Sequence, residues 1–144
     1  YDFSKLHPSG NLGLQLKTVE DLMVTGNKIP FVSENIKMKH ALKIIAKKEL
    51  GILIITNSKK NTLGILTDGQ VRRASLKNKD LQDIKIKKIM TKNPITVHVD
   101  MLAAKALSLM NSKKITSLCV NSKKNIKKTI GIVHIHSILN ANVR

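Results

Sequence analysis

The sequence predicts an α+β protein in which one β-α-β-β-α unit occurs twice, and three observations support this class. Segments of the first half recur in the second half in the same order. Short β-branched segments alternate with segments whose apolar residues recur at helical spacing. Each half also contains two apolar runs joined by a polar turn, as in a β-hairpin. The recurring pairs are residues 19–23 and 86–90, 41–42 and 106–107, 50–55 and 115–120, 57–61 and 121–125, and 63–66 and 130–133.

The first copy is expected to contain a short strand, a helix, a hairpin and a second helix. Residues 29–32 are rich in β-branched side chains, and Pro30 places them at a strand start or sheet edge, where a missing N–H is tolerated. A helix follows, with Met38, Leu42 and Ile45 on one face. The remaining elements are strands 52–56 and 62–67, the turn 57–61 and a helix that begins near Asp68.

The second copy is expected to repeat these elements. Residues 95–97 form the short strand after Pro94, and Asp100 is the predicted N-cap of the next helix. The other elements are the apolar helix stripe of Leu102, Ala106, Leu109 and Met110, the strands 117–120 and 129–134, and a helix that begins near Ser137. A unit of about 60 residues buries little surface, so the two copies are expected to pack together.

The composition argues against two classes of protein. The formal net charge of +17 suggests a nucleic-acid-binding module, but the lysines are scattered and the only aromatic residues are Tyr1, Phe3 and Phe31. No apolar run approaches the length of a membrane helix. The single cysteine, Cys119, and the lack of a signal-peptide pattern favour a cytoplasmic protein.

The order of these elements resembles the CBS domain, named after cystathionine β-synthase. The resemblance is carried by Met23 and Met90, which end the two lead-in segments, and by the strand end at residues 64–67 that leads into a helix. It implies an α/β-type CBS fold, with two repeats at residues 19–78 and 79–144 related by a pseudo-twofold axis. In many relatives, the clefts between the repeats bind adenosine nucleotides.

The resemblance also implies which residues contact a ligand. In the family, the base lies against the first strand, and the ribose and phosphates meet residues after the third strand. A strand end that leads into a helix presents free N–H groups and the positive end of the helix dipole, which suit phosphate. Where the family has an aspartate, this sequence has Gln70 and Ser137, which bind a hydroxyl without a carboxylate's charge. The predicted ligand-binding residues are Ile29, Pro30, Thr67, Asp68, Gln70, Arg73, Ile95, Thr96, His134 and Ser137.

Three segments resemble the bacterial arabinose-5-phosphate isomerases more narrowly: residues 6–13, 64–73 and 131–136. This resemblance implies that residues 1–18 are the tail and linker of an upstream sugar isomerase domain, and that His7 reaches its active site. Such enzymes interconvert ribulose 5-phosphate and arabinose 5-phosphate, for the eight-carbon sugar acid of lipopolysaccharide or capsule. Because the other catalytic residues would precede Tyr1, this chain alone is expected to have no isomerase activity.

The histidines near the second helix start are not expected to bind a metal. His134 and His136 are two residues apart on a predicted strand, so their side chains are expected to point to opposite faces. His134 is expected to face the cleft. No metal and no required cofactor are predicted.

Two functions remain open at this point, with nucleic-acid binding behind both. The chain is a sensor whose ligand is an adenine nucleotide or the CMP-linked eight-carbon sugar acid, or it is an assembly element with a vestigial cleft. The family implies CBS pairs that meet as dimers within a homotetramer, fused to their own sugar isomerase domain.

Overall fold

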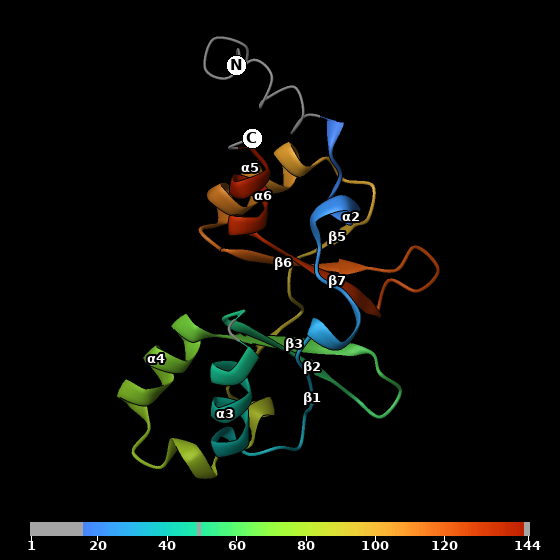
Figure 1. Ribbon diagram of the computed structural model, residues 1–144. Helices are drawn as coiled ribbons and strands as arrows, with labels where there is room; N and C mark the ends of the chain where they lie inside the picture. Colours follow the sequence, from blue (N-terminus) through green and yellow to red (C-terminus); the bar gives the residue numbers. More distant parts are fainter. Residues whose placement is uncertain (1–15, 49, 143–144) are drawn as a thin grey trace. The chain divides into compact units, whose positions relative to one another are not determined.

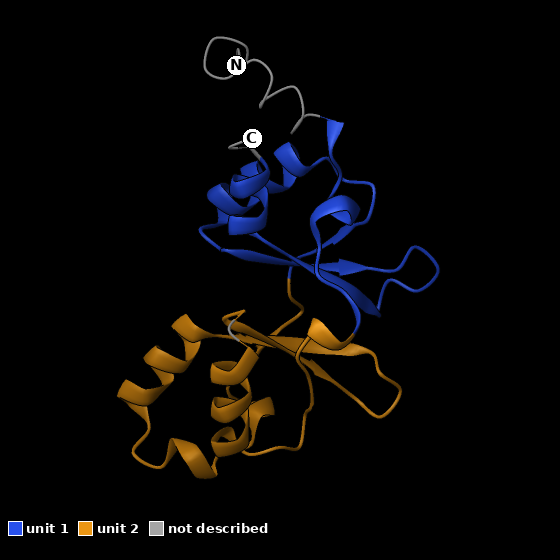
Figure 2. Cartoon of the chain, in the orientation of Figure 1, with its two compact units in different colours: residues 1–26, 95–144 blue, residues 27–94 orange. Residues whose placement is uncertain are grey.

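The computed structural model describes residues 16–48 and 50–142, so His7 and most of the predicted upstream tail lie outside the described residues. The chain forms two compact units (Figure 2): unit 1 comprises residues 1–26 and 95–144, and unit 2 comprises residues 27–94. Each unit contains one small sheet with helices, which confirms the predicted α+β class (Figure 1). No helix of the described part is long and apolar enough to cross a membrane.

Unit 2 is built on a four-stranded sheet in the order β1-β2-β3-β4. Strands β1 and β2 are parallel, whereas β2–β3 and β3–β4 are antiparallel. Its elements are β1 (Phe31–Ser33), α3 (Met38–Lys48), β2 (Ile52–Thr56), β3 (Thr62–Thr67), α4 (Asp68–Lys77), η3 (Leu81–Asp83), η4 (Ile86–Lys88) and β4 (Thr91–Lys92), and η2 (Gly26–Lys28) leads into it.

Unit 1 repeats this plan with a three-stranded sheet in the order β5-β6-β7. Again the first pair of strands is parallel and the second antiparallel. An isolated antiparallel bridge between Val24 and Ile132 stands where unit 2 has β4. The elements are α2 (Val19–Leu22), β5 (Thr96–His98), α5 (Ala103–Lys113), β6 (Ser117–Asn121), β7 (Thr129–His134) and α6 (Ile135–Asn142).

The lead-in segment of each predicted repeat packs in the unit formed mainly by the other repeat. β4 pairs with β3 at Gly64, and Val24 exchanges two backbone hydrogen bonds with Ile132, of 2.9 and 3.1 Å. A Cβ atom at Gly64 would collide with the carbonyl of Thr91, and a Cβ atom at Gly131 would collide with Sδ of Met23. Only glycine therefore allows the lead-ins to lie this close. The predicted boundary between the sequence repeats, at residues 78 and 79, stays a prediction. The compact units do not test it, because each unit combines parts of both repeats.

The buried cores follow the predicted stripes. In unit 2, Met38 and Ile45 are buried and Leu42 packs against the same cluster. In unit 1, Ala106 and Met110 are buried. In each unit the helices lie on one face of the sheet (Figure 1), and this face buries the alternating residues of the central strand.

Three local predictions for unit 1 are wrong. Leu102, not Asp100, is the N-cap of α5, and although Leu102 was predicted to belong to the apolar stripe, it precedes the helix in extended conformation and is 48% exposed. Helix α6 begins at Ile135, two residues before Ser137. The apparent repeat of residues 57–61 at 121–125 is out of structural register, because Asn121 corresponds to the strand residue Thr56 and is buried, whereas Asn57 lies in the turn.

Candidate functional site

Each unit has a corner where the third strand passes directly into a helix. In unit 2, β3 ends at Thr67 and α4 begins at Asp68; in unit 1, β7 ends at His134 and α6 begins at Ile135. We call residues 67–73 the unit 2 corner and residues 134–137 the unit 1 corner. A helix start of this kind presents backbone N–H groups and the positive end of a dipole, which favours anions.

The unit 2 corner is closed by a capping box. Thr67 Oγ1 accepts the backbone N–H of Gln70 at 3.3 Å, and Gln70 Oε1 accepts the backbone N–H of Thr67 at 2.9 Å. The amide of Gln70 also donates through Nε2 to Thr91 Oγ1 on β4. Both the oxygen and the nitrogen of the Gln70 amide therefore stabilise the fold of unit 2, at the position where the resemblance led us to expect a ribose-binding aspartate.

Charged side chains flank this capping box. The Asp68 N–H donates to the Gly51 carbonyl at 3.1 Å, and its exposed carboxylate lies so near Gly51 that a Cβ there would be 2.9 Å from Oδ2. Gly51 has a φ of +72°, which a side chain would strain in any case. Arg73 is exposed, and its guanidinium folds back along the helix: a Cβ at Gly69 would lie 3.3 Å from Nη1. The corner thus carries a cation beside the first turn of α4.

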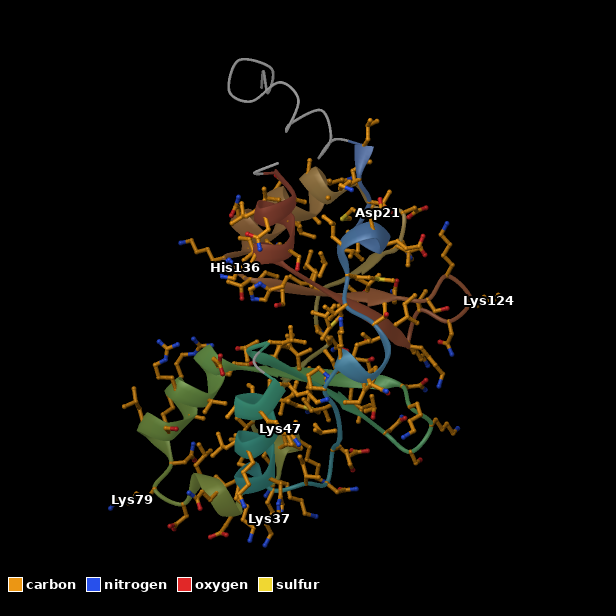
Figure 3. All side chains as sticks on the ribbon, viewed as in Figure 1. Asp21, Lys37, Lys47, Lys79, Lys124 and His136 are labelled. Atoms are coloured by element: carbon orange, nitrogen blue, oxygen red, sulfur yellow. The ribbon has the colours of Figure 1, made fainter. Side chains whose placement is uncertain are left out.

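The unit 1 corner is closed by a histidine. His134 Nδ1 accepts the backbone N–H of His136 at 3.1 Å, so its ring caps α6 as the Thr67 hydroxyl caps α4. The two histidine rings stack, with centroids 4.9 Å apart and planes at 24°, and His136 projects from the first turn of α6 (Figure 3). The prediction that these side chains point to opposite faces is wrong, because the strand ends at His134 and the helix turns His136 back.

The environment of His134 favours the neutral ring. Burial lowers the pKa of His134, and the neighbouring His136 lowers it further. Since Nδ1 accepts a hydrogen bond, the proton of the neutral ring is assigned to Nε2, which is then available as a donor. Among the described residues, no group of three or more histidine, cysteine, aspartate or glutamate side chains is arranged to hold a metal ion.

The residues predicted to meet a base lie at the same end of each sheet as the corner. In unit 2, the Pro30 carbonyl accepts the N–H of Ile54, and Ile52 on the same strand pairs with Thr67. In unit 1, Thr96 pairs with Cys119, and Ser117 pairs with His134. Within each unit, the structure therefore places the residues predicted to contact a base at the same end of the sheet as the residues of the corner.

The positions predicted to contact a base differ in exposure and bonding. Ile29 and Pro30 are buried, whereas Ile95 is 39% exposed and Thr96 is exposed. The hydroxyl of Thr96 accepts a hydrogen bond of 3.3 Å from Nδ2 of Asn121. Ser137, the counterpart of Gln70, is half-buried in the first turn of α6.

Two contributors to the corners were missed by the sequence analysis. The spacing of Thr67 and Gln70 is that of a capping box, so the structural role of Gln70 could have been predicted from this motif. Thr91 could not, because it lies 21 residues from Gln70 and reaches it through the pairing of β3 with β4.

Comparisons with known proteins identify one domain family, which matches the chain twice. The CBS domain model matches residues 19–77 and 86–144. The chain is 39% identical over 143 residues to arabinose 5-phosphate isomerase of Yersinia pestis and 36% identical to that of Escherichia coli K12, and each alignment covers 99% of this chain and 43% of the relative. An uncharacterised Rickettsia prowazekii protein is 36% identical over 142 residues, with the same coverage. The chain thus spans less than half the length of these relatives.

Solved structures show the same fold. A CBS-domain pair in complex with 5′-methylthioadenosine and S-adenosyl-L-methionine is 26% identical, with a TM-score of 0.76 over 86% of this chain and 94% of that chain. A protein of Pyrococcus horikoshii is 23% identical, with a TM-score of 0.78 over 90% and 95% of the two chains. The chain belongs to the CBS-domain family and contains two copies of the domain.

Proposed function

We propose that this chain is the ligand-sensing regulatory module of an arabinose 5-phosphate isomerase. The observation that carries the proposal is the 39% identity over 99% of the chain to an isomerase of that name, of which the aligned part is 43%. The remaining part of such a protein would supply the isomerase domain, and His7 would reach its active site. We place the parent enzyme in the cytoplasm, in keeping with the buried, unpaired Cys119.

The corners support an anionic ligand with a phosphate group. At the unit 2 corner, the Arg73 guanidinium and the first turn of α4 offer positive charge at one place, with the Thr67 hydroxyl beside them. At the unit 1 corner, the Nε2–H of His134 offers a neutral donor. The CBS pair of 26% identity was solved with two adenosine compounds, which favours a ligand with an adenosine moiety. Neither compound carries a phosphate, so the phosphate of an adenine nucleotide is inferred from the corners alone, and the CMP-linked sugar acid stays open as the second ligand.

Regulation requires that the ligand bind one conformation of the enzyme more tightly than another. A ligand held between a base-contacting strand and a corner would resist any change in the distance between them. We therefore expect the bound ligand to alter the activity of the attached isomerase domain through the CBS units, without a role in the chemical step.

An assembly role is the second candidate, and one observation favours it specifically. The Gln70 amide is hydrogen-bonded within unit 2 through both its oxygen and its nitrogen, and Ser137 offers no charge, so neither corner has a carboxylate at the position that a ribose-binding aspartate of the family would occupy. The exposed Leu76 of α4 and Leu139 of α6, which are 86% and 40% exposed, would then face a second CBS pair. This would give homodimers of CBS pairs within a tetramer.

A thermal-shift panel with AMP, ATP, CMP and the CMP-linked sugar acid separates the two candidates, with a random-sequence DNA duplex as a control for nonspecific charge effects. A ligand at a hundred times its dissociation constant stabilises by about 2.7 kcal/mol, roughly 5 to 10 °C for a chain of this size. One nucleotide alone should give this shift, and Arg73→Ala should reduce it. No shift with any ligand would reject the sensor in favour of the assembly role.

A further inference from the structure

Unit 2 contains a hollow away from its corner. It has a volume of about 380 Å³ and lies where the parallel strands β1 and β2 end, between the end of β1 and the β2–β3 turn. We call it the unit 2 hollow; its lining includes Phe31, Glu34, Asn35, Asn57, Ser58 and Lys60. The volume is within the range of small-ligand sites, and the carboxyl ends of parallel strands are a common place for them.

The unit 2 hollow and the unit 2 corner are at opposite ends of β2. Ile52 at the start of the strand pairs with Thr67, whereas Thr56 at its end lines the hollow. Four residue steps of extended strand separate these positions, which is about 13 Å. A phosphate group bound at Thr67 would therefore lie about one strand length away from the hollow.

Two opposite charges stand at the hollow on a fixed backbone. The Glu34 N–H donates to the Thr56 carbonyl at 3.3 Å, and the Lys60 N–H donates to the Asn57 carbonyl at 2.9 Å. Among the described residues, neither Glu34 nor Lys60 forms an ion pair. The Asn57 amide is also oriented, because its Oδ1 accepts the N–H groups of Lys59 and Asn61, both at 3.0 Å.

In unit 1, an ion pair lies at the place that corresponds to the unit 2 hollow. The strand registers align Val32 with Val97 and Thr56 with Asn121, so Asn35 corresponds to Asp100 and Ser58 to Lys123. In unit 1 these two positions form the ion pair, with Nζ and Oδ2 3.1 Å apart. In unit 2 they are an amide and a hydroxyl, with no such bridge, and the hollow lies between them.

The groups around the hollow are complementary to a small sugar that carries one negative charge. A carboxylate such as Glu34 accepts hydrogen bonds from neighbouring hydroxyls, the Asn35 amide can donate or accept, and the Asn57 amide, whose Oδ1 already accepts two N–H groups, can donate through Nδ2. The ammonium of Lys60 suits a phosphate or carboxylate, and the Phe31 ring, 45% exposed, offers an apolar wall. Residues 27–94 contain 16 lysine and arginine against 5 aspartate and glutamate, a formal excess of 11 positive charges, which also attracts an anion.

We propose that the unit 2 hollow is a second ligand site, separate from the corners, that binds a small anionic sugar such as a sugar phosphate. Lys60 takes the anionic group, and Glu34 with the two asparagines takes the hydroxyls. The site is independent of the proposed function, since none of its residues belongs to a corner.

The test is a titration of the chain with D-ribose 5-phosphate, followed by amide NMR signals, beside D-ribose, inorganic phosphate and L-glutamate as separate probes. The expected result is a shift of the signals of Glu34, Asn35 and residues 57–60 with ribose 5-phosphate, and weaker binding of each other probe by about tenfold or more. Equal binding of phosphate alone, tighter binding of glutamate, or shifts confined to residues 67–73 would each overturn the proposal.

Substitutions that place residues of unit 1 at the equivalent positions of unit 2 test whether the hollow is the binding site. The double change Asn35→Asp with Ser58→Lys places the bridging pair of unit 1 at the hollow and should weaken binding at least about tenfold, while the NMR spectrum stays folded. Lys60→Asn, which tolerates the φ of 67° at this position, and Glu34→Gln should each weaken binding by a similar factor. The matched control, Asp100→Asn with Lys123→Ser, and the corner change Arg73→Ala should leave it unchanged. Unaltered binding in the bridged variant would reject the site.

Discussion

In unit 2, the helix after the third strand begins with a capping box of Thr67 and Gln70, whereas in unit 1 the equivalent helix begins with the ring of His134. Both caps satisfy one N–H group of the first helical turn. The first also ties the helix to β4 through Thr91, while the second brings a stacked His136 and a group that can take up a proton. The same backbone plan therefore gives a permanently neutral cap in one unit and a titratable cap in the other.

The largest effect is expected from the glycines that let the lead-in segments approach. At Gly64 a side chain would meet the Thr91 backbone, whereas at Gly131 the nearest atom is the flexible end of Met23. We expect Gly64→Ala to destabilise unit 2 by about 3 kcal/mol and Gly131→Ala to cost about 1 kcal/mol, since a side chain can move aside more easily than backbone. Urea denaturation measures both; an equal cost would show that the two lead-ins are held alike.

The next largest effect is expected at Gln70, which forms the capping box of unit 2, in comparison with Ser137, its counterpart in unit 1. Gln70→Ala removes the bonds to Thr67 and Thr91 and is expected to lower the free energy of unfolding by about 1 to 2 kcal/mol. Gln70→Glu keeps the acceptor for Thr67 and should cost less. Ser137→Ala, the matched control in unit 1, should stay within about 0.5 kcal/mol. A ranking with Ser137→Ala as the most damaging change would contradict this account of the corners.

Acidification should weaken the unit 1 corner and not the unit 2 corner. The pKa of His134 is lowered in the folded chain, so the unfolded chain takes up its proton more readily. The stability from this cap is fully present above about pH 6.5 and decreases as the pH falls from there through the lower folded pKa. Thermal melts between pH 7.5 and 5 should show this loss, and His134→Asn, which keeps a cap, should remove it.

This pH window is distinct from that of the carboxyl groups. The pKa of Asp21 is lowered by its hydrogen bonds from Thr18, and the pKa of Asp100 is lowered by Lys123, so both lose stabilisation in a more acidic range. A slope between pH 7.5 and 5 that persists in His134→Asn would assign the effect to another group.

The smallest effect concerns the ion pair of unit 1. Lys123 and Asp100 are 61% and 65% exposed, and water screens such pairs strongly. We expect Asp100→Asn to leave the melting temperature unchanged within error. A clear fall in melting temperature would mean that the pair holds the turn between β6 and β7.

Much of the fold could be predicted because it depends on the spacing of apolar residues over short stretches of the sequence. The helical stripe of Met38, Leu42 and Ile45 and the alternation in the central strands depend on residue spacing alone. The wrong predictions arose where two local signals competed. Asp100 has the chemistry of an N-cap but forms an ion pair, and the Asn-Ser-Lys-Lys-Asn repeat suggested a register that the strand pairing shifts by one residue.

Some features of the candidate site could also be predicted from the sequence, and others could not. Thr67 could be identified from its position at a helix start, and it is the N-cap of α4. Arg73 is the sixth residue of α4, and its guanidinium lies beside Gly69 in the first turn. The role of His134 as a cap could not be identified in this way, because it depends on whether the chain turns into a helix at residue 135 or 137. The hollow of unit 2 could not be predicted either, since its walls come from the ends of two strands and a turn that only the sheet brings together.

The sequence by itself determined the internal repeat, the order of the main strands and helices, and the strand-to-helix corner of unit 2, because hydrophobic spacing and turn residues act over a few positions along the chain. Only the tertiary structure decided which lead-in packs against which sheet and that Gln70 forms a hydrogen bond with Thr91. It also decided that an ion pair forms near the ends of the strands in unit 1, whereas unit 2 has a hollow there. These features depend on contacts between residues far apart in sequence, and their energies appear only when strand pairing brings those residues within hydrogen-bonding distance.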